Sequence, residues 1–262
     1  TDGTPMLTPT GTAAAITETG DNIFRVCFTD PFQGKIMATY AAENLNAKNV
    51  AIMYNTSDDY SQGVAKAFKE TAEAKGLKVV ANEGYGNDDK DFRTQLTKIQ
   101  ALNIDALFIP DYYSKVALIA TQAREVGYNG PMLGADGWDG VLSVLDDANK
   151  KVVDNCFFSS HFSTSDTTPV VTNFVKNYQA KYGEMPTGFS ALGYDAAYIM
   201  VEAIKKAGST DKAKIVEALK NTELECVTGN ITFDAQGDPI KSVAIIKLQD
   251  GKASLDTKIS AK

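Results

Sequence analysis

The chain has 262 residues, 44% hydrophobic and 23% charged, which is typical of a folded protein rather than a disordered one. Its net charge of −7 disfavours nucleic-acid binding, because a phosphate backbone attracts positively charged proteins. No apolar run approaches the roughly 20 residues of a membrane span, and three separated cysteines with the single His161 argue against a zinc cluster.

From residue 5 to residue 134, short apolar runs alternate with amphipathic segments. The runs predict strands at 5–8, 50–54, 77–81, 106–110 and 131–134. The segments between them predict helices at 32–46, 59–75, 91–101 and 114–126. Gly76 and Gly127 follow two of these helices, as is common at helix ends. Continuous apolar strands alternating with helices indicate an α/β fold whose parallel sheet is buried on both faces.

After about residue 150 the pattern changes. A strand is predicted at 152–159, a polar connection at 161–168, and helices at 169–182, 188–207 and 211–220. The tail is β-like, with strands at 230–234 and 243–248 and a turn signal at Asp250-Gly251.

No motif for an enzyme is present: the sequence has no G-x-S-x-G elbow, no phosphate-binding loop and no dinucleotide fingerprint. The segment 234–238 favours a hairpin turn over a calcium loop. His161 is expected to be structural, and Cys27, Cys156 and Cys226 to be buried thiols. We therefore expect no catalytic activity, no cofactor and no metal site.

Polar and aromatic residues gather where the predicted parallel strands end, which is where open α/β sheets bind ligands. They are the segment 8–12, Tyr60, the segment 111–113 and the segment 134–138. Aromatic rings, hydroxyls and one carboxylate suit a small zwitterion better than a phosphate or a metal ion.

Several segments carry a resemblance to one family in a single register over essentially the whole chain. They are PMLTPTGT (5–12), FRVCFTDPFQG (24–34), DDYSQGVAKAFKE (58–70), DKDFRTQLTKI (89–99), LGADGWD (133–139), GYDAA (193–197) and VTGNITFDAQGDP (227–239). The chain resembles the branched-chain (Leu/Ile/Val) amino-acid binding proteins of ABC transporters, which have the type I periplasmic binding-protein fold. That resemblance implies two Rossmann-like lobes with parallel sheets and an amino acid bound in the cleft between them.

The resemblance also implies the ligand-binding residues: Thr10, Thr12, Tyr60, Tyr112, Asp136 and Phe189. The Thr10 carbonyl and the Asp136 carboxylate would take the ligand ammonium, and the Thr12 hydroxyl and amide its carboxylate. Tyr60 and Tyr112 would close over the ligand, and Phe189 would line its side-chain pocket. Further residues expected near the site are Trp138, Asp30, Phe32, Tyr113 and Tyr194. Taken singly, each could instead be a loop cap or a packing residue.

By the same resemblance, residues 1–29 and 160–241 are expected to form lobe 1, and residues 30–159 and 242–262 lobe 2. Lobe 2 is expected to be complete. The family pattern begins about three βα units before the first strand of this chain, about 90 residues, so lobe 1 is expected to be a remnant. Its uncovered sheet edge favours a dimer or a swapped assembly.

The function that follows is a solute-binding protein, or a truncated form of one, that captures a small aliphatic L-amino acid and passes it to the membrane permease of an ABC importer. The expected location is extracytoplasmic, either periplasmic or lipid-anchored at the cell surface. Two alternatives stay open at this point: a ligand-sensing domain of a receptor, and a self-associating lobe without binding activity.

Overall fold

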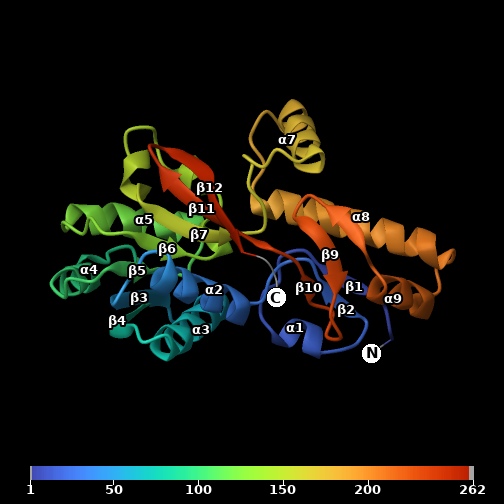
Figure 1. Ribbon diagram of the computed structural model, residues 1–262, viewed down its shortest axis with the longest axis horizontal. Coiled ribbons are helices and arrows are strands. Elements are labelled where there is room, and N and C mark those ends of the chain that lie inside the picture. The colour runs from blue at the N-terminus through green and yellow to red at the C-terminus, as the bar shows by residue number, and fades with distance from the viewer. Residues whose placement is uncertain (1, 260–262) are drawn as a thin grey trace. The chain divides into compact units, whose positions relative to one another are not determined.

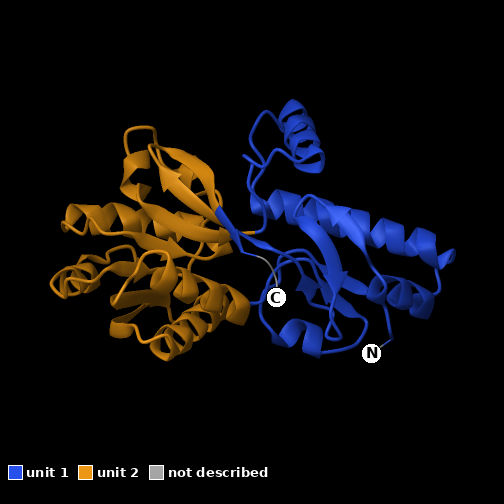
Figure 2. Ribbon diagram, viewed as in Figure 1, with its two compact units in different colours: residues 1–29, 161–244, 257–262 blue, residues 30–160, 245–256 orange. Residues whose placement is uncertain are grey.

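A computed structural model describes residues 2–259. It divides the chain into two compact units, shown in Figure 2. Unit 1 comprises residues 1–29, 161–244 and 257–262, and unit 2 comprises residues 30–160 and 245–256. The chain therefore passes from one unit to the other at residues 29/30, 160/161, 244/245 and 256/257.

Unit 2 is built on one twisted sheet with the strand order β12-β11-β7-β6-β5-β3-β4 (Figure 1). The strands are β3 (Asn49–Asn55), β4 (Lys78–Tyr85), β5 (Ala106–Phe108), β6 (Met132–Gly134), β7 (Cys156–Ser160), β11 (Val243–Gln249) and β12 (Lys252–Ile259). From β4 through β3, β5 and β6 to β7 all neighbours are parallel. Every residue of β5, β6 and β7 is buried, which confirms the predicted parallel sheet covered on both faces.

Helices connect these strands: α2 (Asp30–Glu43), α3 (Asp59–Ala74), α4 (Arg93–Gln100) and α5 (Tyr113–Glu125), with the short α6 (Val141–Val144). Helices α2 and α3 pack side by side in Figure 1, and Gly34 permits the close approach. A Cβ at Gly34 would lie 2.6 Å from the Val64 carbonyl oxygen. The Asp58 side chain caps α3 by accepting from the Ser61 amide at 2.8 Å. Gly76 and Gly127 have the left-handed φ that sequence analysis predicted after α3 and α5.

Unit 1 begins with β1 (Met6–Thr8), which pairs in parallel with β2 (Ile23–Arg25) across the short helix α1 (Ala15–Glu18). Its helices are α7 (Pro169–Tyr182), α8 (Gly188–Ala207) and α9 (Lys212–Lys220). Its other sheet is antiparallel and joins β8 (Leu224–Cys226), β9 (Gly229–Phe233) and β10 (Pro239–Ile240). Phe24, Leu192 and Ile231 bring β2, α8 and β9 together in one core.

Two of the differences from the predicted elements have a clear local reason. The strand predicted at 152–159 is β7 at Cys156–Ser160, because Lys150–Val153 forms a 3-10 helix, η2, and Asn155 has a φ of 57°. Strand β12 was not predicted. Its residues are mostly exposed, so it has no apolar run, but the predicted turn at Asp250-Gly251 does lead into it.

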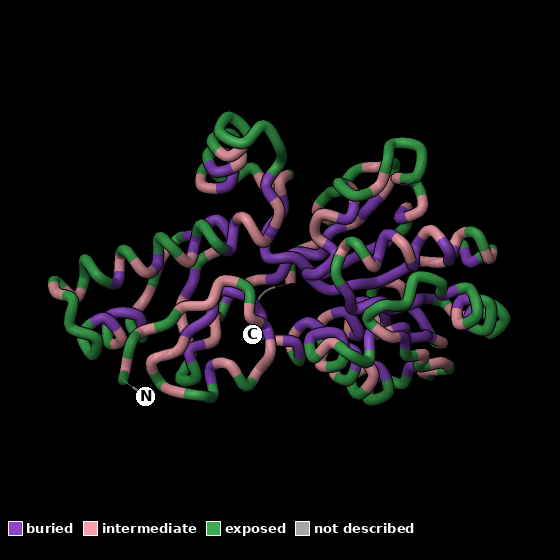
Figure 3. The backbone as a smooth tube through the Cα atoms, turned by 180° about the vertical axis from the view of Figure 1, so that it is seen from behind, coloured by how far each residue is buried: buried purple, intermediate pink, exposed green. Residues whose placement is uncertain are grey.

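Burial follows this architecture, as Figure 3 shows. The strands in the middle of the main sheet are buried, whereas α8 carries exposed residues from Gly193 to Lys206. Within residues 2–259, none of the helices is both long enough and apolar enough to cross a membrane.

Candidate functional site

The predicted site residues of unit 2 follow three neighbouring parallel strands. Tyr60 lies in the first turn of α3, after β3, and Tyr112 is the N-cap of α5, after β5. Asp136 begins the 3-10 helix η1 (Asp136–Trp138), after β6. Because β3, β5 and β6 are adjacent and parallel, their carboxyl ends share one edge of the sheet. Sequence-distant residues are thereby brought together.

The Asp136 carboxylate is held in place by two neutral donors. The Tyr60 hydroxyl donates to its Oδ1 at 2.9 Å, and the Gln33 side-chain amide donates to the same oxygen at 3.0 Å. The Tyr60 hydroxyl in turn accepts from the Gly137 amide at 2.9 Å. Gly137 is required at this point, since a Cβ there would lie 2.7 Å from the Asp111 carbonyl oxygen. Asp136 is buried, and so are both of its donors.

Tyr112 lies against Tyr60, with the two ring centroids 4.9 Å apart and the ring planes 31° apart. It is 44% exposed, so it presents a partly open aromatic surface beside a buried one. The Tyr112 amide donates to Asp111 Oδ1 at 2.6 Å, and the Tyr85 hydroxyl donates to Asp111 Oδ2 at 2.6 Å. Asp111 thus fixes the start of α5 and the backbone of Tyr112.

The electrostatic environment of the two tyrosines is negative. Burial, and next the charge of Asp136, raise the pKa of Tyr60 well above its usual value. Burial raises the pKa of Tyr112 to about 12, and every charged group that adds to this shift is a carboxylate. Those groups are Asp58, Asp136, Asp30 and Asp111. This cluster of unit 2 is therefore suited to a positively charged ligand group.

In unit 1, Thr10 and Thr12 lie on the loop between β1 and α1, where Thr10 is exposed and Thr12 is buried. One fully buried side chain, Arg25 of β2, organises this loop. All five of its N–H donors are used, at 2.5–3.0 Å. They bind the carbonyl oxygens of Gly11, Ala13 and Ala14, the Thr17 hydroxyl and the Asp238 carboxylate.

The remaining predicted residues have different surroundings. Phe189 is half-buried in the first turn of α8. Trp138 is a fully buried core residue whose indole donates to the Ile109 carbonyl oxygen at 2.7 Å, so its proximity to Asp136 is structural. Tyr194 is exposed on α8, next to Tyr198. Asp30 and Phe32 belong to α2, and Tyr113 is the first residue of α5.

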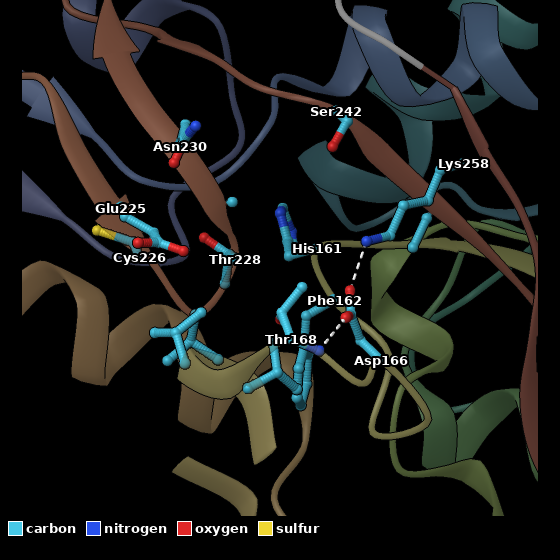
Figure 4. A pocket seen from close by; sticks show the side chains of 15 residues that line it. His161, Phe162, Asp166, Thr168, Glu225, Cys226, Thr228, Asn230, Ser242 and Lys258 are labelled. Atoms are coloured by element: carbon cyan, nitrogen blue, oxygen red, sulfur yellow. Dashed lines mark hydrogen bonds and ion pairs between the residues drawn. The ribbon is translucent and has the colours of Figure 1, made fainter. Parts of the chain in front are cut away.

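Unit 1 also holds a cavity of about 220 Å³, shown in Figure 4, which none of the predicted ligand residues lines. Its wall carries His161, which stacks on Phe28 with 4.5 Å between ring centroids. It also carries an ion pair in which Lys258 donates to Asp166. Asp166 accepts from the Thr168 amide as well, at 2.9 Å. These two wall charges neutralise each other, and Glu225 adds a further carboxylate to the wall.

The three cysteines are buried free thiols, as predicted. In the part of the chain that the structure describes, no three His, Cys, Asp or Glu side chains are grouped so that they could hold a metal ion.

Sequence analysis missed Gln33 and Arg25, the two side chains that arrange the candidate binding loops. A signal for Arg25 existed, because a charged residue inside the apolar run FRVCF (24–28) implies a buried and paired charge. Gln33 had no such signal, since glutamine in a helix is ordinarily a solvated residue.

Comparison with known proteins agrees with this fold. A family model described as "Periplasmic binding protein" matches residues 1–253. The chain is 29% identical over 241 residues to the leucine-, isoleucine-, valine-, threonine- and alanine-binding protein of Pseudomonas aeruginosa, covering 90% of this chain and 63% of that protein. It thus spans less than two thirds of that relative's length.

Among solved structures, the leucine-binding protein LivK of Thermotoga maritima matches with a TM-score of 0.90 and 35% identity, over 98% of this chain and 73% of that one. The branched-chain amino-acid transporter binding protein LivJ of Streptococcus pneumoniae, in complex with isoleucine, matches with a TM-score of 0.85 and 32% identity, over 98% and 72%. The family comprises binding proteins rather than enzymes. With its parallel sheet and with the family model matching nearly its full length, this chain belongs to the periplasmic binding protein family.

Proposed function

We propose that this chain binds a small aliphatic L-amino acid, outside the cytoplasm, for the permease of an ABC importer. The observation that carries the proposal is the Asp136 carboxylate, which is buried and held by Tyr60 and Gln33, both neutral. Both donors are uncharged, so neither of them supplies the positive charge that the ammonium of an amino acid would bring to Asp136. The relatives named for branched-chain amino acids support the same ligand class.

The other ligand residues belong to the proposal in the roles that the resemblance implies. Asp136 and the Thr10 carbonyl take the ammonium, and the Thr12 hydroxyl and amide take the carboxylate. Tyr112 and Tyr60 contact the ligand through their rings, and the half-burial of Tyr112 is what such a contact needs. Phe189 contacts the aliphatic side chain.

Calorimetry with two matched ligands tests this function. L-leucine and 4-methylpentanoate share the carboxylate and the branched chain, and only leucine carries an ammonium. We expect leucine to bind at least about 30-fold more tightly, because 4-methylpentanoate lacks the ammonium group that Asp136 would bind. Equal affinity for the two ligands, or binding of glucose in place of leucine, would contradict the proposal.

We further propose that two copies of this chain associate through unit 1. The side chains of Tyr194, Tyr198, Val201 and Ile204 are 40–53% exposed on α8. Their spacing of three or four residues places them on one helix face, and contiguous exposed apolar surface of this kind is typical of an interface. Within residues 2–259, β1 pairs with β2 alone, and an unpaired strand edge is a second feature that favours association.

Analytical ultracentrifugation tests the association. We expect the wild type to sediment as a dimer of the 28.1 kDa chain, and Tyr198→Glu with Val201→Glu to sediment as a monomer, because two charges would have to be buried. Val144→Glu is the matched control, since Val144 is 46% exposed in unit 2. A wild-type monomer at every concentration tested would show that this surface does not mediate self-association.

A further inference from the structure

Gln33 is a fully buried polar residue in the first turns of α2, a helix in which sequence analysis placed no ligand-binding residue. Its side-chain amide joins three segments of unit 2. Its Nε2 donates to Asp136 Oδ1 at 3.0 Å, and its Oε1 accepts from the Asp136 backbone amide at 3.0 Å. The same Oε1 accepts from the Ser159 hydroxyl, at the end of β7, at 3.1 Å.

These contacts allow only one orientation of the Gln33 amide. The Asp136 backbone amide is a donor and requires an oxygen opposite it, while the Asp136 carboxylate requires a hydrogen. If Oε1 and Nε2 were exchanged, Nε2 would face the Asp136 backbone amide, donor against donor. Oε1 would face the Asp136 carboxylate, acceptor against acceptor. Gln33 therefore determines both where the backbone of Asp136 lies and which way its carboxylate turns.

A neutral glutamine suits this position better than a positively charged side chain would. Lysine or arginine at this position would donate to Asp136 too, but it would form an ion pair and compete with a ligand cation. A neutral amide donor binds the carboxylate without bringing a positive charge of its own. Tyr60 contributes the second neutral donor, from α3.

We propose that Gln33 is a positioning residue, which holds the Asp136 carboxylate in the orientation in which it binds the ammonium group of a ligand. This inference rests on the function proposed above. It makes Gln33 essential for affinity even though its own side chain is bonded to the protein rather than to the ligand.

Two variants separate the contribution of the Gln33 side-chain oxygen from that of its nitrogen. Gln33→Met removes every hydrogen bond at nearly constant volume. Gln33→Glu keeps an oxygen for the Asp136 amide and the Ser159 hydroxyl, but it sets a second carboxylate against Asp136 Oδ1. Titratable groups beside this cluster include Tyr60 of α3, and also Asp30, Asp58 and Asp111, whose charges act on Tyr112.

The readout is leucine affinity as a function of pH, measured by calorimetry. For Gln33→Met we expect a loss of roughly 5- to 150-fold. We also expect its affinity to begin falling at a higher pH than in the wild type as the solution is acidified, because the carboxylate has lost a donor to its charged form. For Gln33→Glu we expect affinity to fall as pH rises, because the two carboxylates share a proton only at lower pH. The two variants thus have opposite pH slopes.

Gln122→Met is the matched control. Gln122 is also a buried glutamine of unit 2 whose amide both accepts and donates, in this case with backbone groups: it accepts from the Phe92 amide at 2.7 Å and donates to the Lys90 carbonyl oxygen at 2.8 Å. We expect Gln122→Met to lose about as much thermal stability as Gln33→Met. Its leucine affinity should nevertheless change with pH as that of the wild type does.

The outcomes distinguish the two proposals. Failure of the wild type to bind any ammonium ligand overturns the proposed function, and the role of Gln33 with it. If the wild type binds leucine, and the affinity of Gln33→Met changes with pH in parallel with that of the wild type, only the role of Gln33 is overturned. A Gln33→Glu variant that binds more tightly as pH rises also overturns it, because charge rather than orientation would then govern affinity.

Discussion

Replacing Arg25 with methionine is expected to lower the free energy of unfolding by about 3–5 kcal/mol, the usual effect of removing one partner of a buried ion pair. Arg25 is fully buried, and its Nε donates to Asp238 at 2.5 Å. Methionine fills much of the same volume but donates nothing. Three carbonyl oxygens of the loop at residues 11–14 would then lose their guanidinium donors together, and the Asp238 carboxylate would keep the Thr17 hydroxyl, which donates to it at 3.0 Å.

Urea unfolding followed by circular dichroism measures this effect. Arg25→Lys is expected to recover only part of the loss, since one ammonium cannot reach five acceptors that face a planar guanidinium. Arg93→Met is the control, because Arg93 is half-exposed and forms surface ion pairs with Asp91 and Glu125. Such pairs contribute about 0–1 kcal/mol. A loss for Arg25→Met no larger than for Arg93→Met would show that Arg25 does not organise the loop.

Sequence patterns predicted the helices of unit 1 well where local chemistry marks both ends. The segment 169–182 is helical over the predicted range because Pro169 suits the first turn and Gly183 adopts a φ of 77°. The helix 188–207 begins at a capping box formed by Thr187 and Ser190 and ends at Gly208. These signals lie within a few residues of the boundary, so they can be read without knowing the tertiary structure.

Elements that depend on distant partners were predicted less well. Strand β12 has few apolar residues, because it is an edge strand that β11 supports, and nothing in its own sequence reveals β11 as its neighbour. The predicted strand at 152–159 began too early. Val152 and Val153 have high β propensity, but Asn155 turns the chain and leaves them in η2.

The same distinction applies to the candidate site. Tyr60, Tyr112 and Asp136 were predicted from their positions after parallel strands, and the structure brings these three together. Their role in binding stays a prediction. Gln33 could not be found in this way, because its partners are 103 and 126 residues away along the chain. A buried amide that links distant segments has no local pattern.

The substitution Asp136→Asn is expected to weaken leucine binding by about 2–5 kcal/mol, roughly 30- to 5,000-fold. Asparagine has the same shape as aspartate, and its carbonyl oxygen can still accept from Tyr60 and Gln33, so the fold of unit 2 should persist. What disappears is the negative charge, and the ligand ammonium then enters a buried site without a counter-ion. Calorimetry gives the affinity, and thermal unfolding verifies that the variant is folded.

Asp105→Asn provides the control, since it removes one carboxylate from the same unit. Asp105 lies outside the candidate site, where its side chain accepts from the Lys48 and Asn49 backbone amides. Its affinity for leucine should equal that of the wild type, which separates the local charge of Asp136 from the net charge of the protein. If Asp136→Asn and Asp105→Asn both bound leucine like the wild type, the ammonium would have to be paired elsewhere. The carboxylate cluster around Tyr60 and Tyr112 would then have a structural role only, and Asp136 would no longer be a ligand-binding residue.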